Sequence, residues 1–261
     1  MKDKLRELYQ ASPPLAVTGW VQWILALVFL TLAPFDSRTI LGISPWIKPM
    51  KFSVSIAIYV WTLAWLLRYL SRHAAAVKRI SWCVAFLMMG EITIIALQSA
   101  RGVPSHFNIA TPLDAALFSI MGTMIGVNTA LLVWVTALFF VDAPELPPAY
   151  LWGIRFGLTI FLLASFEGVF IVSHGSHTVG APDGGSGFPF VNWSRQHGDL
   201  RVAHFAGMHA LQVLPLVGYW LSRSRTSERA QILYTSAAFG LYFAIVLSLF
   251  WLALLGRPLT L

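Results

Sequence analysis

The chain has 261 residues, of which 57% are hydrophobic and only 11% are charged. A soluble domain carries about 25% charged residues, because it must cover its surface with groups that water solvates. Most side chains here must therefore face lipid or one another, which excludes an ordinary soluble enzyme and a disordered chain. The formal net charge is +7, but we expect no nucleic-acid partner. The basic residues lie mainly at the ends of apolar segments, where membrane topology explains them.

Seven apolar segments are long enough to cross a bilayer, which takes about 20 predominantly apolar residues. They are long and do not alternate in polarity, so each predicts a helix rather than a barrel strand. The predicted spans are about 16–35, 52–70, 80–101, 114–141, 149–173, 201–222 and 230–255. The sequence therefore predicts an all-α, polytopic membrane bundle of seven transmembrane helices, formed as one domain over residues 1–261.

Lysine and arginine are divided unevenly between the two sides of this bundle. The side that holds the N-terminus receives eleven of the 18 basic residues, and the other side receives seven. Because cytoplasmic loops carry the excess of positive charge, we expect a cytoplasmic N-terminus and a C-terminus outside. The expected partner is the lipid bilayer, and the expected location is a bacterial inner (plasma) membrane. A homo-oligomer and a complex with a membrane partner subunit both stay open.

The longest predicted outer loop covers about residues 174–200. It is rich in glycine, and it contains Phe188, Phe190 and Trp193. Loops of this length are usually either functional or disordered. The aromatic side chains favour the first alternative, so we expect an ordered loop over the outer end of the bundle.

Histidines and membrane-buried carboxylates gather in the outer half of the predicted bundle. Glu91 and Glu167 lie within spans, where an ionisable group is costly and usually faces the bundle interior, a cavity or a partner. At 1.5 Å per residue, Glu91 lies about 15 Å and Glu167 about 9 Å below the outer ends of their helices. Of the seven histidines, only His73 maps to the inner side. The six outer histidines are His106, His174, His177, His197, His204 and His209.

Three chemistries fit this set of polar residues. The first is a site for a transition metal (iron, copper or zinc), because imidazole and carboxylate ligands suit these ions. The second is haem b, since His174 and His204 fall at similar depth on neighbouring helices. The third is a proton relay through buried glutamates and histidines. The candidate ligands are Glu91, Glu167, His174, His204 and His209, and the residues expected beside them or at the rim are Gln98, Arg101, His106, His177, Asp199 and Gln212.

Several of these residues also fit simpler roles. His204 and His209 are five residues apart, so their side chains point about 140° away from each other on an ideal helix. This angle makes it harder for both histidines to bind the same metal ion. Asp199 fits a cap at the start of the sixth span as well as an acceptor that orients a liganding histidine. The alternative to a functional site is that the whole set forms a hydrogen-bonded network that fixes helix packing.

The sequence thus favours a metal- or haem-dependent membrane oxidoreductase whose site faces the extracytoplasmic side. Two alternatives stay open. One is a proton-coupled transporter that uses Glu91 and Glu167, and the other is a non-catalytic membrane subunit or assembly factor that docks through its outer loops.

Overall fold

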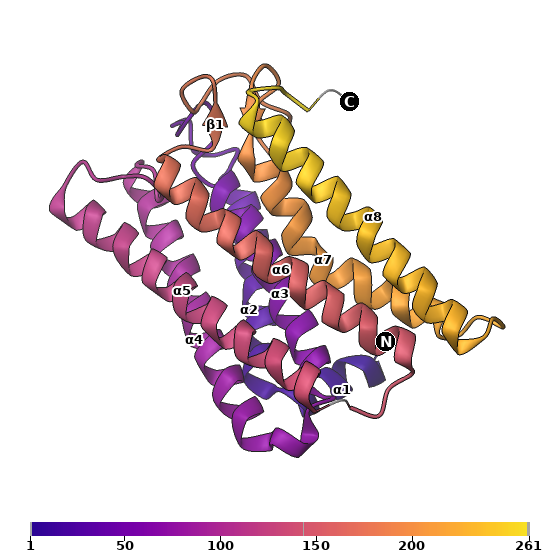
Figure 1. Cartoon of the computed structure of the whole chain (residues 1–261). Coiled ribbons are helices and arrows are strands. Elements are labelled where there is room, and N and C mark those ends of the chain that lie inside the picture. Colours follow the sequence, from indigo (N-terminus) through magenta and orange to yellow (C-terminus); the bar gives the residue numbers. More distant parts are fainter. Residues whose placement is uncertain (1, 143, 260–261) are drawn as a thin grey trace. The chain divides into compact units, whose positions relative to one another are not determined.

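The computed structural model describes residues 2–142 and 144–259 and confirms an all-α architecture (Figure 1). The only sheet within these residues is a short antiparallel hairpin, in which Thr178 pairs with Asp199. The elements in chain order are α1 (Lys2–Ala11), α2 (Pro13–Leu32), α3 (Ile47–Leu67), the 3-10 turn η1 (Ser71–His73), α4 (Ala74–Arg101), α5 (Pro112–Val141), α6 (Pro148–His174), β1 (Thr178–Val179), β2 (Gly198–Asp199), α7 (Leu200–Leu221) and α8 (Glu228–Leu254).

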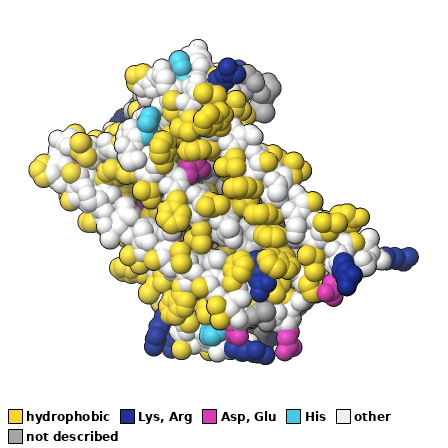
Figure 2. All heavy atoms as spheres, in the orientation of Figure 1, with side chains coloured by type: hydrophobic (Ala, Val, Ile, Leu, Met, Phe, Trp, Pro, Cys, Tyr) yellow, Lys and Arg dark blue, Asp and Glu magenta, His cyan; other side chains and the backbone are white. Residues whose placement is uncertain are grey.

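Six helices among the described residues are long and apolar enough to cross a membrane, namely α2, α3, α4 together with η1, α5, α6 and α8. Figure 2 shows hydrophobic side chains spread over the face that it draws, with few charged side chains among them. The remaining predicted span, 201–222, corresponds to α7, a helix of 22 residues. This helix is less apolar than the other six, because it contains His204, His209, Gln212 and Pro215. The number of seven spans therefore stays a prediction.

The chain divides into two compact units, Met1–Leu131 and Leu132–Leu261. The boundary falls within α5, so the first unit holds α1 to α4 with the first part of α5. The second unit holds the rest of α5, α6, the hairpin, α7 and α8.

In the first unit, α2 and α3 pack through a large aromatic side chain. The indole of Trp61 on α3 covers Gly19 on α2, where a Cβ atom would collide with the ring. The indole Nε1 donates a hydrogen bond to the Ala16 carbonyl at 3.2 Å. At the other end of the unit, α4 stops at Gly102, which adopts a left-handed conformation with φ 75°. Glycine adopts this conformation at no steric cost, so its position fixes the end of α4.

In the second unit, α6 and α7 approach each other backbone to backbone. A Cβ atom on Gly153 of α6 would lie 2.5 Å from the Leu214 carbonyl oxygen, and one on Gly157 would lie 2.8 Å from the Ala210 carbonyl oxygen. Small residues allow such close approach between membrane helices, where lipid supplies no hydrophobic driving force. The sequence therefore specifies this pair of helices through its glycines.

The third long helix of this unit, α8, covers the α6–α7 pair. Phe156 on α6 stacks on Phe239 on α8 with ring centroids 4.3 Å apart. The Tyr242 hydroxyl donates to the Ala206 carbonyl of α7 at 2.6 Å. In Figure 1 the three helices run side by side, with the β1–β2 hairpin beside the C-terminal end of α8.

Candidate functional site

The structure places Glu91 inside the first unit. It lies on the buried face of α4 among Met88, Ile92 and Ile95, and only 3% of its surface is exposed. Its Oε1 atom is fully buried and has no hydrogen-bond partner among the described residues. An unpartnered polar atom in an apolar interior is costly, so such an atom calls for an explanation.

Two of the predicted rim residues, Gln98 and Arg101, bind a carboxylate that the sequence analysis did not single out. Asp114, at the start of α5, is 2% exposed. It accepts hydrogen bonds from Gln98 Nε2 at 2.9 Å, from Arg101 Nη1 at 2.6 Å and from the Thr111 hydroxyl at 2.6 Å. Its own N–H donates to Thr111 Oγ1 at 3.1 Å. These bonds close the loop between α4 and α5, so we interpret the cluster as structural.

His106 lies in the same loop, within a pocket of aromatic rings. Its Nδ1 atom is 3.2 Å from Lys48 Nζ and 3.1 Å from the Ser105 hydroxyl. The rings of Phe52 and Phe118 lie 5.7 and 6.2 Å from the imidazole, measured between centroids. This imidazole therefore anchors the loop against α3 and α5.

Glu167 and His204 lie in the second unit, where α6 meets α7. His204 Nδ1 is 2.9 Å from the Ala164 carbonyl oxygen, so Nδ1 carries the hydrogen and Nε2 keeps its lone pair. The ring packs close to Gly168, whose Cβ, if present, would lie 3.1 Å from His204 Cε1. Glu167 lies between Ala164 and Gly168 in the sequence of α6, and its Oε1 atom is buried without a hydrogen-bond partner in the described part of the chain.

His174 and His209 make contacts of their own. His174 is exposed at the end of α6, and its Nδ1 atom is 3.0 Å from the Ser176 carbonyl oxygen. His209 Nδ1 is 3.2 Å from Gln212 Oε1, and its ring contacts Phe205 at 4.3 Å between centroids. Across residues 2–142 and 144–259, no group of three or more His, Cys, Asp or Glu side chains that could hold a metal ion is found. The predicted ligands thus occur as separate residues.

Asp199 caps α7 and closes the long loop after α6. Its Oδ1 atom accepts from the backbone N–H of Arg201 at 3.1 Å and from Arg201 Nε at 2.9 Å. Its Oδ2 atom accepts from the Ser194 N–H at 2.8 Å and from Arg201 Nη2 at 2.6 Å. The four bonds favour the capping role over a role in orienting a histidine.

His177 forms a second link in this loop, with Asp183. The two side chains approach to 2.8 Å between His177 Nδ1 and Asp183 Oδ1, and the Thr178 N–H donates to the same oxygen at 2.9 Å. Burial would raise the pKa of Asp183, but the hydrogen bonds from His177 and Thr178 hold that pKa well below its ordinary value. Burial lowers the pKa of His177, although the Asp183 carboxylate opposes this effect. The close approach of the His177 imidazole and the hydrogen bond from the Thr178 N–H therefore favour the ionised form of the Asp183 carboxylate.

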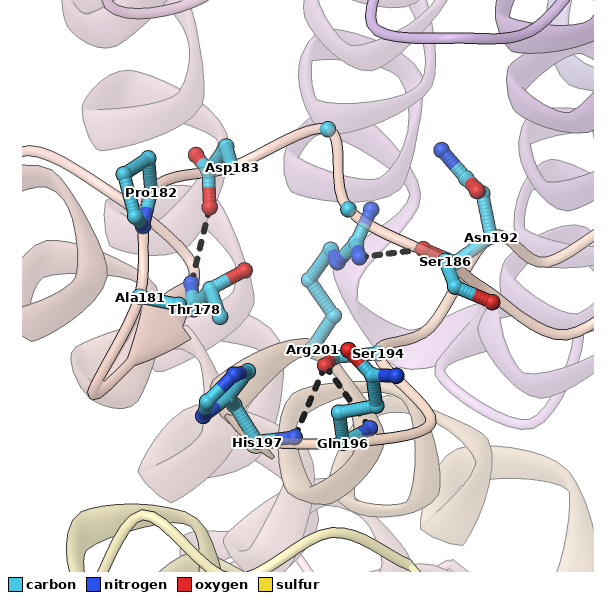
Figure 3. A pocket seen from close by; sticks show the side chains of 12 residues that line it. Thr178, Ala181, Pro182, Asp183, Ser186, Asn192, Ser194, Gln196, His197 and Arg201 are labelled. Carbon is cyan, nitrogen blue, oxygen red and sulfur yellow. Dashed lines mark hydrogen bonds between the residues drawn. The ribbon is translucent and has the colours of Figure 1, made fainter.

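The loop encloses a cavity of about 370 Å³ (Figure 3). Its lining includes the side chains of Asp183, Gln196, His197 and Arg201. Figure 3 shows the Arg201 side chain crossing the middle of the cavity, where Nη2 donates to the Asn192 carbonyl at 2.6 Å. Guanidinium, imidazole, amide and carboxylate groups give this cavity a polar lining of a size that suits a small polar molecule.

Only some of these residues had a signal in the sequence. Thr111 and Asp114 are three residues apart, which is the spacing of a helix capping box. Arg201 follows Asp199 by two residues at a helix start. By contrast, the cavity depends on how the loop folds over itself, which no local pattern encodes.

No family model matches the chain, and no curated protein or solved structure matches it either. The assignment of the chain to a class of protein therefore depends on its fold and its composition. Apolar helices long enough to cross a bilayer define an all-α integral membrane protein whose environment is lipid.

Proposed function

We propose that the protein is a proton-coupled membrane transporter in which Glu91 and Glu167 carry the protons. The observation that carries this proposal is that each unit holds one glutamate within a long apolar helix, Glu91 buried and Glu167 half-buried, and each has a buried Oε1 atom that no described residue hydrogen-bonds. Neither carboxylate has an ion-pair partner among the described side chains. A metal site is less well supported, because it would require several of the predicted ligands to converge on one point. A structural network is also less well supported, because it would require hydrogen-bond partners for both glutamates.

The physical basis is the cost of a charge in an apolar interior. An ionised carboxylate is expensive there unless water or a cation reaches it. Each glutamate therefore gains or loses its proton together with a change in its surroundings, and this links proton movement to a change in conformation. In the same proposal, the loop cavity around Arg201 and His197 receives a small anionic solute on the extracytoplasmic side of a bacterial inner membrane.

Infrared difference spectra between acidic and alkaline buffer test the proton-carrying role without knowledge of the solute. We expect a protonated-carboxyl band in the wild type that loses one component in Glu91→Gln and another in Glu167→Gln. Glu228→Gln is the matched control, because Glu228 is exposed at the start of α8. Spectra that neither buried substitution changes would reject the proposal.

Transport itself is measured in liposomes that enclose a pH-sensitive dye, with a panel of small carboxylates added outside. Solute-driven acidification should fall by about tenfold or more in Glu91→Gln and Glu167→Gln, and it should persist in Glu228→Gln. Acidification that survives replacement of both buried glutamates contradicts their role.

A metal- or haem-dependent oxidoreductase is the second candidate, and it rests on the geometry of His204. Metal-binding histidines commonly donate one ring N–H to a backbone carbonyl, which leaves the other nitrogen to bind the metal. His204 makes such a bond to Ala164, close in sequence to Glu167.

Visible spectra of the oxidised and reduced protein, together with elemental analysis, decide this case. A haem band, or stoichiometric iron, copper or zinc, should disappear in His204→Gln and remain in His73→Gln. Purified protein with neither signal rejects the oxidoreductase.

A further inference from the structure

A second cavity lies in the first unit, where α2 and α4 begin and α3 ends. It measures about 630 Å³. One wall is apolar and includes Pro13, Pro14, Val77 and Trp82. The Trp82 side chain is 60% exposed. Exposed tryptophans at the ends of apolar helices are typical of the membrane–water interface, so this cavity lies at the level of lipid headgroups.

Two serine hydroxyls in the lining have no hydrogen-bond partner. Ser12 and Ser81 are each 2% exposed, and their Oγ atoms are fully buried and unbonded within the described part of the chain. Ser12 stands at the N-cap position of α2, but Pro13 and Pro14 follow it and provide no N–H for it to cap. Both hydroxyls are therefore free to donate to an acceptor in the cavity.

The charged side chains of the lining leave an excess of positive charge. Arg68 pairs with Glu7 at 3.0 Å and lies over the Trp65 ring at 4.4 Å. Lys78 is exposed, and it has no ion-pair partner among the described side chains. The Glu7–Arg68 pair is neutral as a whole, so Lys78 supplies the net charge at the rim.

We propose that this cavity binds the phosphate headgroup of an anionic phospholipid. The phosphate accepts hydrogen bonds from the Ser12 and Ser81 hydroxyls and faces Lys78, and the glycerol and upper acyl chain lie against the proline and tryptophan wall. Basic pockets between membrane helices bind lipid headgroups through this combination of charge and apolar surface. A free phosphate would use the hydroxyls and Lys78 but would gain nothing from the apolar wall.

Native mass spectrometry of the delipidated full chain tests this proposal with three probes: phosphatidylglycerol, phosphatidylcholine and inorganic phosphate. Phosphatidylglycerol should bind at least about tenfold more tightly than phosphatidylcholine. Lys78→Gln should remove most of this preference, whereas Arg79→Gln should keep it. Arg79 is the matched control because it is the next residue, is also exposed and does not line the cavity. Both positions are exposed, so neither substitution disturbs the core.

Ser81→Ala provides a second, independent variant. It should weaken phosphatidylglycerol binding several-fold without lowering the thermal unfolding temperature, because the hydroxyl it removes is buried and has no hydrogen-bond partner in the described part of the chain. Equal binding of the two lipids, or equal effects of Lys78→Gln and Arg79→Gln, would overturn the proposal. Inorganic phosphate that displaces the lipid at similar concentration would identify a free-phosphate site instead and would also overturn it.

Discussion

The α2–α3 pair of the first unit and the α6–α7 pair of the second are held together in different ways. In the first pair, the Trp61 indole fills the space above Gly19 and donates to a helix carbonyl. In the second pair, Gly153 faces the Leu214 carbonyl, so main-chain atoms of the two helices are nearest neighbours. A side chain can move to another rotamer, but the backbone of a hydrogen-bonded helix cannot. The two pairs should therefore differ in how well they tolerate added volume.

The largest effect is expected from Gly153→Leu. The new side chain would collide with the α7 backbone, so the two helices must separate, and we expect a loss of about 3 kcal/mol or more in the free energy of unfolding. Gly240→Leu on α8 is the control, since nothing lies within 4 Å of the position where its Cβ would stand. Unfolding by denaturant in micelles measures both variants. Similar losses in the two would contradict the close backbone contact.

A smaller effect is expected from Gly19→Ala. The added methyl group must displace Trp61, which breaks the hydrogen bond to the Ala16 carbonyl, at a cost of about 1 to 2 kcal/mol. Because Trp61 is what the methyl group displaces, Trp61→Leu should cost less in the Gly19→Ala background than in the wild type. A double-mutant cycle measures this difference. Strictly additive losses would show that the two residues do not interact.

The smallest effect is expected in the loop of the second unit, as a pH dependence. The folded loop lowers the pKa of His177, so the stability that this residue contributes is fully present above about pH 6.5. This stability is lost as the pH falls through that value toward the lower pKa of the folded state. The pKa of Asp183 is also lowered, but its contribution persists until the pH falls below about 4.

Hydrogen exchange of the amides in residues 175–199, corrected for intrinsic rates, measures this opening. Exchange should become faster below about pH 6.5 in the wild type. His177→Gln should remove the pH dependence in that range. If the substituted loop kept the same pH dependence, another group would be responsible.

The helical class and the positions of the spans could be predicted from the sequence, because long apolar segments have few alternatives. The helix boundaries were less accurate. The span expected at 52–70 is the helix Ile47–Leu67, which begins earlier because Lys48 and Pro49 are accommodated in its first turn. The ten-residue helix α1 was not predicted, since it is polar and precedes the first apolar segment.

The depth of a residue along its helix could be predicted from the sequence, but the direction in which its side chain points around the helix axis could not. Glu91 is buried and Glu167 is half-buried, yet a metal site depends on the rotation of each helix about its axis. The sequence indicated the relative directions of two side chains only where both lie on the same helix. His204 binds the Ala164 carbonyl of α6 whereas His209 contacts Gln212, as their five-residue spacing indicated.

The polarity of α7 has a consequence for how the protein enters the membrane. This helix lies along α6 from Leu214, beside Gly153, to His204, beside Gly168, although it is more polar than the six apolar helices. A polar helix gains little from entering lipid alone, but it gains when a neighbour supplies hydrogen-bond acceptors, as Ala164 does for His204. We therefore expect that α7, if it crosses the bilayer, enters it together with α6 as one helical hairpin, with the close glycine contacts already formed.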